Sequence, residues 1–204
     1  MRTSRLEAFS DGVLAIIITI MVLELRVPDA PTLEALRHSA TGFSTYLLSF
    51  VYVGIYWNNH HHMFHVVETV GGGVLWANLH LLFWLSLFPF TTGWMDESGF
   101  ARTPTVVYGV DLLMAAIAYY TLQQMIFRRP GGEALRRALG RDLKGKSSPV
   151  LCLLGMAACW VEPLLGVALY AVLALLWLVP DRRVERFVRA GSIDGDGDGD
   201  EEER

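Results

Sequence analysis

Charged residues are scarce in this chain: they make up 19% of it, whereas hydrophobic residues make up 52%. This composition excludes a typical soluble protein and indicates a chain whose solvent is a lipid bilayer. Because a helix needs about 20 apolar residues to cross a bilayer, we expect an all-α, polytopic membrane protein with six transmembrane helices. The hydrophobic stretches lie at about residues 12–26, 40–58, 72–95, 104–127, 148–162 and 164–180.

Cysteine is also scarce, and the two cysteines cannot pair with each other. Cys152 and Cys159 fall on one predicted helix, about 10 Å apart along its axis, which is too far for a disulfide. They therefore say nothing about the cellular compartment. The features of a secretory signal are missing too, because the first helix carries an acidic residue and has no small-residue cleavage site before Glu24. We expect this helix to stay in the protein.

Lysine and arginine, 17 residues in all, are unevenly distributed along the chain. Two precede the first predicted helix, none connects the second to the third, seven connect the fourth to the fifth, and five follow the last. The opposite side has only Arg26, Arg37 and Arg102. Positive residues near the ends of spans favour the cytoplasmic side. An asymmetry of 14 to 3 therefore predicts that both termini are cytoplasmic.

The end of the chain alternates Asp and Gly from Asp194 to Asp200 and superficially fits the opening of a calcium-binding loop. The Glu that completes such a loop would fall one residue beyond Arg204, and no apolar helix follows. We therefore interpret residues 191–204 as a disordered acidic tail, and residues 1–190 as one six-helix transmembrane domain.

Histidines gather at the end of the second hydrophobic stretch, at His60, His61, His62 and His65. On a helix, His61 and His65 could share one metal ion, as in a His-ligated membrane metalloenzyme. Such enzymes need many nitrogen and carboxylate ligands, and the chain has six histidines in total. We therefore expect interfacial or hydrogen-bonded histidines, with no cofactor, while a weak structural metal site stays open as an alternative.

Three polar residues, Arg5, Ser10 and Asp11, stand at the start of a helix that is then almost entirely apolar from Val13 to Leu23. Ser10 or Asp11 could simply cap the helix. However, polar groups at a spanning helix face protein or water and by default mark a functional site. Arg5 and Asp11 are about 9 Å and 240° apart on the helix, so they cannot pair with each other. We expect a polar network that ties this helix to its neighbours.

The same helix carries an apolar stripe formed by Ile16, Ile20 and Leu23, with Thr19 beside it. Stripes of this kind usually pack against other helices.

A carrier would be expected to have an intramembrane carboxylate or lysine near mid-depth, or broken helices at matching points in two halves, and we find neither pattern in the sequence.

The residues of this helix also form a recognisable motif. It contains Arg5-x-x-x-Phe9-Ser10-Asp11-Gly12-Val13, then Ala15-Ile16 and Thr19-Ile20-Met21-Val22-Leu23-Glu24. This pattern resembles the signature of the transmembrane protein 175 family of potassium channels. Further blocks that resemble the family are Ile55-Tyr56-Trp57-x-x-His60-His61, Leu75-Trp76-x-Asn78-Leu79-x-x-Leu82-Phe83 and Pro89-Phe90. The resemblance covers residues 5–95; residues 96–204 agree in hydropathy only, and Leu14 stands where the family has Phe.

The resemblance implies a potassium-selective, leak-type cation channel in the cell membrane, without enzymatic activity. In the prokaryotic form, which a single repeat resembles, four subunits assemble and the first helix of each lines the pore. Ile16 matches the narrow hydrophobic constriction, Ile20 and Leu23 match further apolar layers, and Thr19 matches an adjacent hydroxyl. The structural motif matches Arg5, Phe9, Ser10 and Asp11, and its partners match Trp57, His60, Trp76, Asn78 and His80.

The physical chemistry of such a pore fits this expectation. A ring of Ile16 side chains can gate by dewetting. Preference for K⁺ over Na⁺ would come from the lower dehydration cost of K⁺, helped by Thr19. We expect His80 and Trp76 to supply the hydrogen-bonding groups that pair with Arg5 and Asp11. The expected binding partners of the protein are K⁺, lipid and further copies of the chain, and we expect no nucleic acid. A cation transporter or proton-coupled carrier stays open as the alternative.

Overall fold

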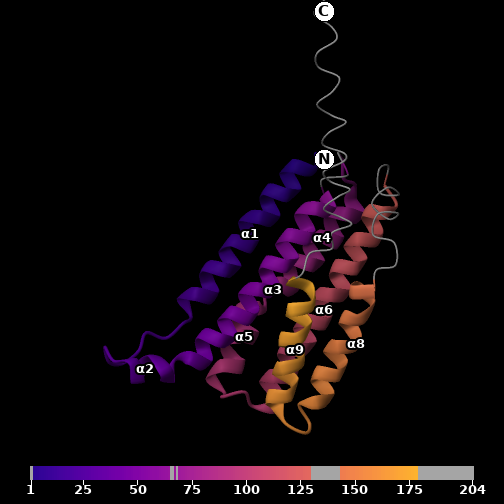
Figure 1. Ribbon diagram of the computed structural model, residues 1–204. Coiled ribbons are helices and arrows are strands. Elements are labelled where there is room, and N and C mark those ends of the chain that lie inside the picture. Colours follow the sequence, from indigo (N-terminus) through magenta and orange to yellow (C-terminus); the bar gives the residue numbers. More distant parts are fainter. Residues whose placement is uncertain (1, 65–66, 68, 130–142, 179–204) are drawn as a thin grey trace, which may run out of the picture.

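The computed structural model describes residues 2–64, 67, 69–129 and 143–178 (Figure 1). Within these residues the regular structure is helical, apart from one isolated bridge between Arg2 and Thr69. The acidic tail, the calcium-loop pattern and His65 lie outside the described residues. The helices are α1 (Thr3–Leu23), α2 (Leu33–His38), α3 (Ala40–Phe64), α4 (Gly72–Leu85), α5 (Phe88–Glu97), α6 (Arg102–Phe127), α8 (Leu143–Ala158) and α9 (Pro163–Leu178).

Three helical segments of the described chain are long and apolar enough to cross a membrane: Thr3–Leu23, Gly72–Glu97 and Arg102–Phe127. The second of these segments consists of α4 and α5 taken together. Two shorter apolar helices, Ser147–Ala158 and Pro163–Leu178, have 10–17 residues each. Helix α3 is long enough to cross a membrane, with 25 residues, but it is not among these three segments. Its last turns carry the polar run from Asn58 to His62. The structure thus supports an all-helical membrane protein, and the count of six spans stays a prediction.

The hydrophobic stretch 72–95 forms two helices rather than one. Helix α4 ends at Leu85 and α5 begins at Phe88, with Pro89 in its first turn. Proline has no backbone N–H, so it cannot donate to the carbonyl one turn earlier and is favoured where a helix begins. The break lets α5 leave α4 and pack against α3 and α6.

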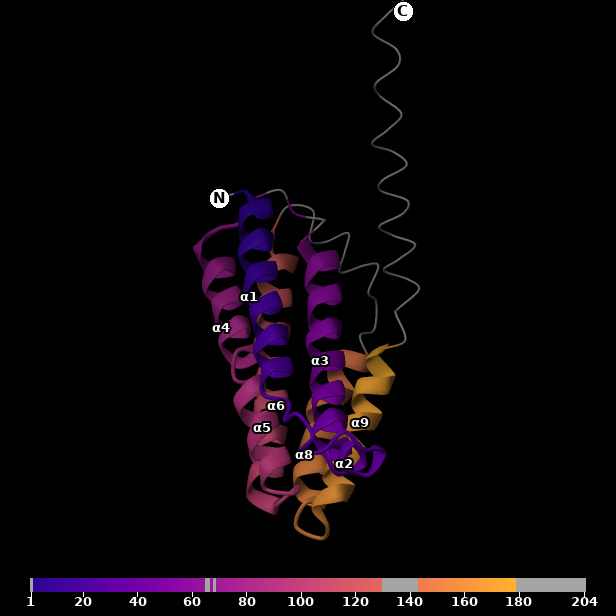
Figure 2. The same ribbon diagram turned by 90° about the vertical axis from the view of Figure 1, so that its left-hand side faces the viewer.

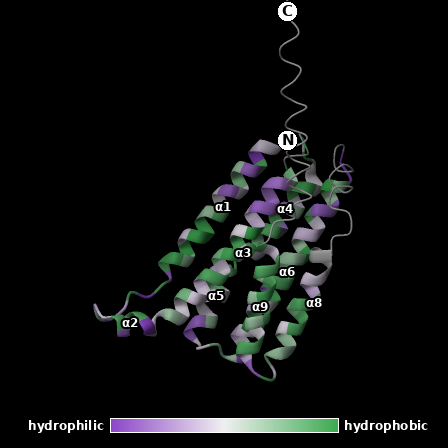
Figure 3. Ribbon diagram, viewed as in Figure 1, coloured by the Kyte–Doolittle hydropathy of each residue, from purple (hydrophilic) through white to green (hydrophobic). Residues whose placement is uncertain are grey.

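The long helices run side by side, and α2 lies at the end of the bundle opposite the N-terminus (Figures 1 and 2). Helix α6 is central and packs against α4, α5, α8 and α9. Helix α1 lies at one side of the bundle and contacts α3, α4 and α5. Figure 3 shows polar residues on α1 near its N-terminal end and mostly apolar ones farther along.

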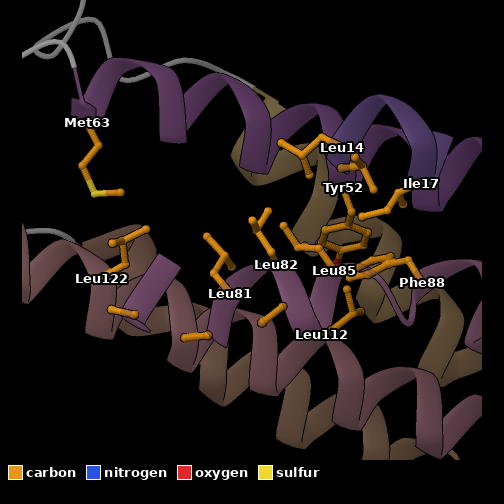
Figure 4. Close-up of a cluster of buried hydrophobic side chains, with 14 of the residues drawn as sticks. Leu14, Ile17, Tyr52, Met63, Leu81, Leu82, Leu85, Phe88, Leu112 and Leu122 are labelled. Atoms are coloured by element: carbon orange, nitrogen blue, oxygen red, sulfur yellow. The ribbon is translucent and has the colours of Figure 1, made fainter. Parts of the chain in front are cut away.

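The core joins α1 to the rest of the bundle through one face of the helix (Figure 4). Leu14 and Ile17 from α1 are buried in one cluster with Tyr52 from α3, Leu82 from α4 and Leu112 from α6. Because membrane helices associate mainly through close van der Waals packing, this interdigitated face fixes the rotation of α1 about its axis. The rotation decides which residues α1 leaves uncovered.

Candidate functional site

A chain of buried hydrogen bonds joins α1, α4 and α3 near the N-terminal end of α1. Asn78 Nδ2 donates to Ser10 Oγ at 2.9 Å, and Asn78 Oδ1 lies 2.7 Å from His60 Nε2. Ser10 Oγ in turn donates to the Leu6 carbonyl at 2.9 Å. Ser10 and Asn78 are fully buried, and His60 is almost so. This chain of hydrogen bonds crosslinks three helices.

The geometry of this network assigns the donors and acceptors. Because the Asn78 amide nitrogen donates to Ser10, its carbonyl oxygen faces His60, so His60 must carry its hydrogen on Nε2. The His60 ring also lies against Phe64, with ring centroids 4.5 Å apart. Buried polar groups that are fully paired stabilise one arrangement of a core, whereas removing one member leaves the others unsatisfied.

A second, more exposed pair involves Asp11. Trp57 Nε1 donates to Asp11 Oδ1 at 3.0 Å, and the Trp57 ring stacks on His61 at 6.3 Å between centroids. Glu7 Oε1 lies 3.8 Å from His61 Nδ1, close enough for an ion pair when the histidine is protonated. The contacts of Asp11 and Glu7 therefore extend the link between α1 and α3 beyond the buried network.

The expected pairing of Asp11 with His80 or Trp76 is not found in the structure, where Asp11 accepts from Trp57. Trp76 and His80 are exposed on α4, and His80 Nε2 accepts from Trp84 Nε1 at 3.0 Å. The reason is helical phase: both residues stand two positions from Asn78, which turns them about 200° away from the buried network. Trp57 is instead the residue that donates to Asp11.

Arg5 and Phe9 complete the motif on α1, and both are exposed. In the described part of the chain Arg5 has no hydrogen bond or ion pair. The first turn is held instead by Thr3, whose Oγ1 donates to the Val67 carbonyl at 2.5 Å. The motif residues thus divide into a buried member, Ser10, and three members on the uncovered side of α1.

The apolar stripe of α1 is uncovered as well. Ile16, Ile20 and Leu23 are 59%, 42% and 81% exposed, whereas Ile17, one position from Ile16, is 3% exposed. Thr19 is also exposed, and its Oγ1 donates to the Ile16 carbonyl at 2.8 Å. Helix α1 therefore has one face in the core and one apolar face that the described part of the chain leaves open.

Beyond the stripe, the end of α1 is followed by charged groups. Arg26 Nη2 lies 2.6 Å from Glu97 Oε1, which links the segment after α1 to the end of α5. Both side chains are largely exposed, so this ion pair is expected to contribute little to stability.

One buried residue was missed in the sequence. Asp111 lies inside α6, is 3% exposed, and accepts through Oδ2 from Thr91 Oγ1 at 2.9 Å. Its Oδ1 is buried without a partner among the described residues. The expectation that the spans hold no intramembrane carboxylate was therefore wrong. The signal was present, since Asp111 interrupts the apolar stretch 104–127.

The metal alternative finds no geometric support in the described residues, where no three His, Cys, Asp or Glu side chains lie close enough together to hold an ion. His60 is committed to Asn78, and His61 stacks on Trp57.

The fold and the site together define an α-helical integral membrane protein with an uncovered apolar face on its first helix. Residues 5–89 match a family model described as "Endosomal/lysosomal potassium channel TMEM175". A protein from Chryseobacterium sp. (strain P1-3) named as a potassium channel is 49% identical over 93% of this chain and 99% of its own length. The chain therefore belongs to the TMEM175 family, which is a family of channels.

Two more relatives extend the comparison. The mouse protein named "Endosomal/lysosomal proton channel TMEM175" is 27% identical over 84% of this chain but only 36% of the mouse chain. The crystal structure of a homologue from Chamaesiphon minutus, described as a lysosomal potassium-selective channel TMEM175 homologue, has a TM-score of 0.71 at 30% identity. That match covers 86% of this chain and 95% of the other.

Proposed function

We propose that this chain is the subunit of a homotetrameric, potassium-selective, leak-type cation channel whose pore is lined by α1. Ile16 forms the narrow constriction, and Ile20 and Leu23 form further apolar layers. The subunit crosses the cell membrane six times, with both termini in the cytoplasm, as the distribution of Lys and Arg predicts. The Chryseobacterium and Chamaesiphon relatives are described as potassium channels, and the mouse relative is described as a proton channel.

The observation that carries this proposal is the uncovered face of α1. One subunit packs Ile17 inside and leaves Ile16, Ile20 and Leu23 outside. A single chain cannot enclose a pore with one helix face, but four copies of that face around an axis can do so in closed cyclic symmetry. A Cβ at Gly12 would also meet nothing within 4 Å, so this side of the helix is open over several turns.

The chemistry of such a pore is that of a hydrophobic gate. A ring of Ile16 side chains excludes water when narrow and admits a partly dehydrated ion when it widens. Apolar side chains offer no coordinating oxygen, so the ion that loses its water more cheaply, K⁺, is favoured over Na⁺. Thr19 adds oxygens: its hydrogen is donated to the Ile16 carbonyl, which leaves the lone pairs of Oγ1 for an ion.

The buried network has a structural role in this proposal. Asn78, Ser10 and His60 hold α1 against α4 and α3, so that the rotation of α1 presents Ile16 to the axis. Asp11 adds the contact with Trp57. None of these groups is assigned to the permeating ion.

The experiment that tests the proposal is planar-bilayer recording of the purified protein under opposed K⁺ and Na⁺ gradients. We expect ohmic single-channel current that reverses near the K⁺ equilibrium potential. Current that reverses midway between the two equilibrium potentials would contradict potassium selectivity, and the absence of unitary current would contradict the channel.

Asp111 favours a second candidate, a cation transporter or proton-coupled carrier. A buried intramembrane carboxylate is a typical component of proton-coupled transport. A carrier would give a saturating flux that stops without a counter-ion gradient and is lost in Asp111→Asn. Ohmic current that persists in Asp111→Asn would reject this candidate.

A further inference from the structure

A carboxyl group is buried where α5 packs against α6. Asp111 lies within α6, a helix long and apolar enough to span the membrane, and Thr91 of α5 is its hydrogen-bond partner. Both residues are 3% exposed. An ionised carboxylate that is isolated in an apolar interior costs far more free energy than a neutral polar group. A carboxyl group in this place therefore needs a counter-charge or a proton.

No counter-charge accompanies Asp111 in the described part of the chain. Its Oδ2 contacts a neutral hydroxyl, and its Oδ1 is buried without a hydrogen-bond partner among these residues. Tyr108, one turn earlier in α6, and Tyr56 of α3 lie close enough to interact with the carboxyl group electrostatically. Cys152 of α8 and Tyr170 of α9 lie beside Tyr108. Phenols and thiols are uncharged at neutral pH, so none of these groups supplies a positive charge.

The charged and titratable residues of α5 and α4 lie elsewhere. Asp96 and Glu97 stand at the C-terminal end of α5, where both interact with Arg26. His80 of α4 is exposed. Because Arg26 is paired with Glu97 outside the core, it does not neutralise a carboxyl group inside it.

The lysines of α8 stand at a different level of the bundle from Asp111. Met156 of α8 lies against Gly109, half a turn before Asp111 in α6. Lys144 and Lys146 precede Met156 by about 15 Å of helix or more. A proton therefore remains as the means of neutralising the carboxyl group.

The hydroxyl of Thr91 gives a separate reason for a proton on Asp111. Thr91 Oγ1 lies 2.9 Å from Asp111 Oδ2, 3.2 Å from the Leu87 carbonyl oxygen and 3.4 Å from the Phe88 carbonyl oxygen. A hydroxyl has one hydrogen, so it cannot donate fully to the carboxyl group and to its own helix at once. A protonated Oδ2 removes this conflict, because it donates to Oγ1 and leaves the Thr91 hydrogen for the Leu87 carbonyl.

We propose that Asp111 is a resident proton-binding site, in which a neutral carboxyl group donates from Oδ2 to Thr91 Oγ1 and joins α6 to α5. Oδ1 is then a neutral carbonyl oxygen, whose burial costs much less than that of an anionic oxygen. A proton also needs no space of its own, whereas a water molecule needs a cavity. The proposal does not rest on ion conduction. A carrier would release the proton in every cycle, whereas here the proton is part of the folded structure.

Infrared spectroscopy of the full-length protein in dodecyl maltoside, a detergent without carbonyl groups, tests the proposal at about pH 6. Exposed Asp and Glu are ionised at this pH, and only a protonated carboxyl group has a carboxylic acid C=O stretching band. We expect this band in the parent and its loss in Asp111→Asn. Asp29→Asn, at an exposed position, is the matched control and should keep the band. The same spectrum in this region for the parent and Asp111→Asn would mean that Asp111 is ionised, and would overturn the proposal.

The neighbouring threonines of α5 give a second matched pair. Thr91→Val removes the acceptor of the proposed hydrogen bond, so the band should move to higher frequency. Thr92→Val removes a hydroxyl that lies 2.6 Å from Ser49 Oγ and should leave the band in place. A band that stays in place in Thr91→Val would overturn the proposal, and this comparison holds even if Asp111→Asn fails to fold.

The pH dependence of stability provides an independent measurement. Asp in an unfolded chain is ionised above about pH 4, so a folded state that keeps the proton binds one proton more and loses stability as the pH rises. Relative to Asp111→Asn, the unfolding equilibrium constant of the parent should rise about tenfold between roughly pH 5 and pH 6. The ratio cancels groups that both proteins share, such as His60 and His61. A ratio that does not change with pH, measured by denaturant unfolding in the same detergent, would overturn the proposal.

Discussion

The two faces of α1 carry nearly the same chemistry but have different environments. Leu14, Ile17 and Met21 on one face are 2–3% exposed, whereas Ile16 and Ile20 on the other are 59% and 42% exposed. Hydrophobicity alone does not distinguish them, because all five are large and apolar. The rotation of the helix does, and it is fixed by core packing and by the Ser10 network. The first face packs into the core of the chain, and we propose that the second lines a pore.

The largest effect on this comparison should come from Asn78. Asn78→Leu removes both hydrogen bonds at the centre of the network and leaves Ser10 and His60 partly unpaired in the core. We expect a loss of about 2–4 kcal/mol in the free energy of unfolding. Thermal unfolding of the purified protein measures it. Asn59→Leu, on the partly buried side of α3, is the control and should cost much less, because its amide bonds only to its own helix.

Adjacent isoleucines on α1 give a matched pair. Ile17→Ala opens a cavity in the core and should cost about 1–3 kcal/mol of unfolding free energy, less than in a soluble protein because lipid is as apolar as the core. Ile16→Ala should change the stability of the subunit by about 0.5 kcal/mol or less. Equal losses at the two positions, measured in the same unfolding assay, would mean that the faces are not distinct.

Asp11 tests the boundary between the two faces. Asp11→Ala removes the acceptor of Trp57 and should cost about 0.5–1.5 kcal/mol, with a lower yield of tetramer and less current. Size-exclusion chromatography and bilayer recording measure these effects. A stable Asp11→Ala tetramer with altered ion selectivity would instead place Asp11 in the pore.

The smallest expected effect is at Thr19. Thr19→Val keeps the shape of the side chain and removes its hydroxyl oxygen from the open face. We expect an intact channel whose preference for K⁺ over Na⁺ falls severalfold, as judged from reversal potentials under mixed ionic conditions. An unchanged reversal potential would mean that the Thr19 hydroxyl does not contribute to the preference for K⁺, which would then come from the apolar layers alone.

Helical spacing was sufficient to predict the stripe on α1, since Ile16, Ile20 and Leu23 fall together on the face that the structure leaves open. It was not sufficient for the partners of α1. Asn78 and His60 came from the resemblance to the family, and their contacts depend on how α4 and α3 are rotated. That rotation also explains why Trp57, rather than His80 or Trp76, is the partner of Asp11.

The C-terminal half was harder to interpret from sequence. Asp111 is visible in the stretch 104–127, but its burial depends on α5 packing across α6 and bringing Thr91 to it. Proline at residue 89 could have predicted the break between α4 and α5, because proline in a helix interior removes a hydrogen bond.

The central claim is that the open face of α1 lines the pore with Ile16 at its narrowest point. Ile16→Asn in single-channel recording tests it most directly, with Ile117→Asn on an exposed position of α6 as the chemically matched control. A polar ring wets the constriction, so Ile16→Asn should raise the conductance and shift the reversal potential away from the K⁺ equilibrium value, while Ile117→Asn leaves both unchanged. Ile16→Asn channels that conduct and select like the parent would contradict the claim.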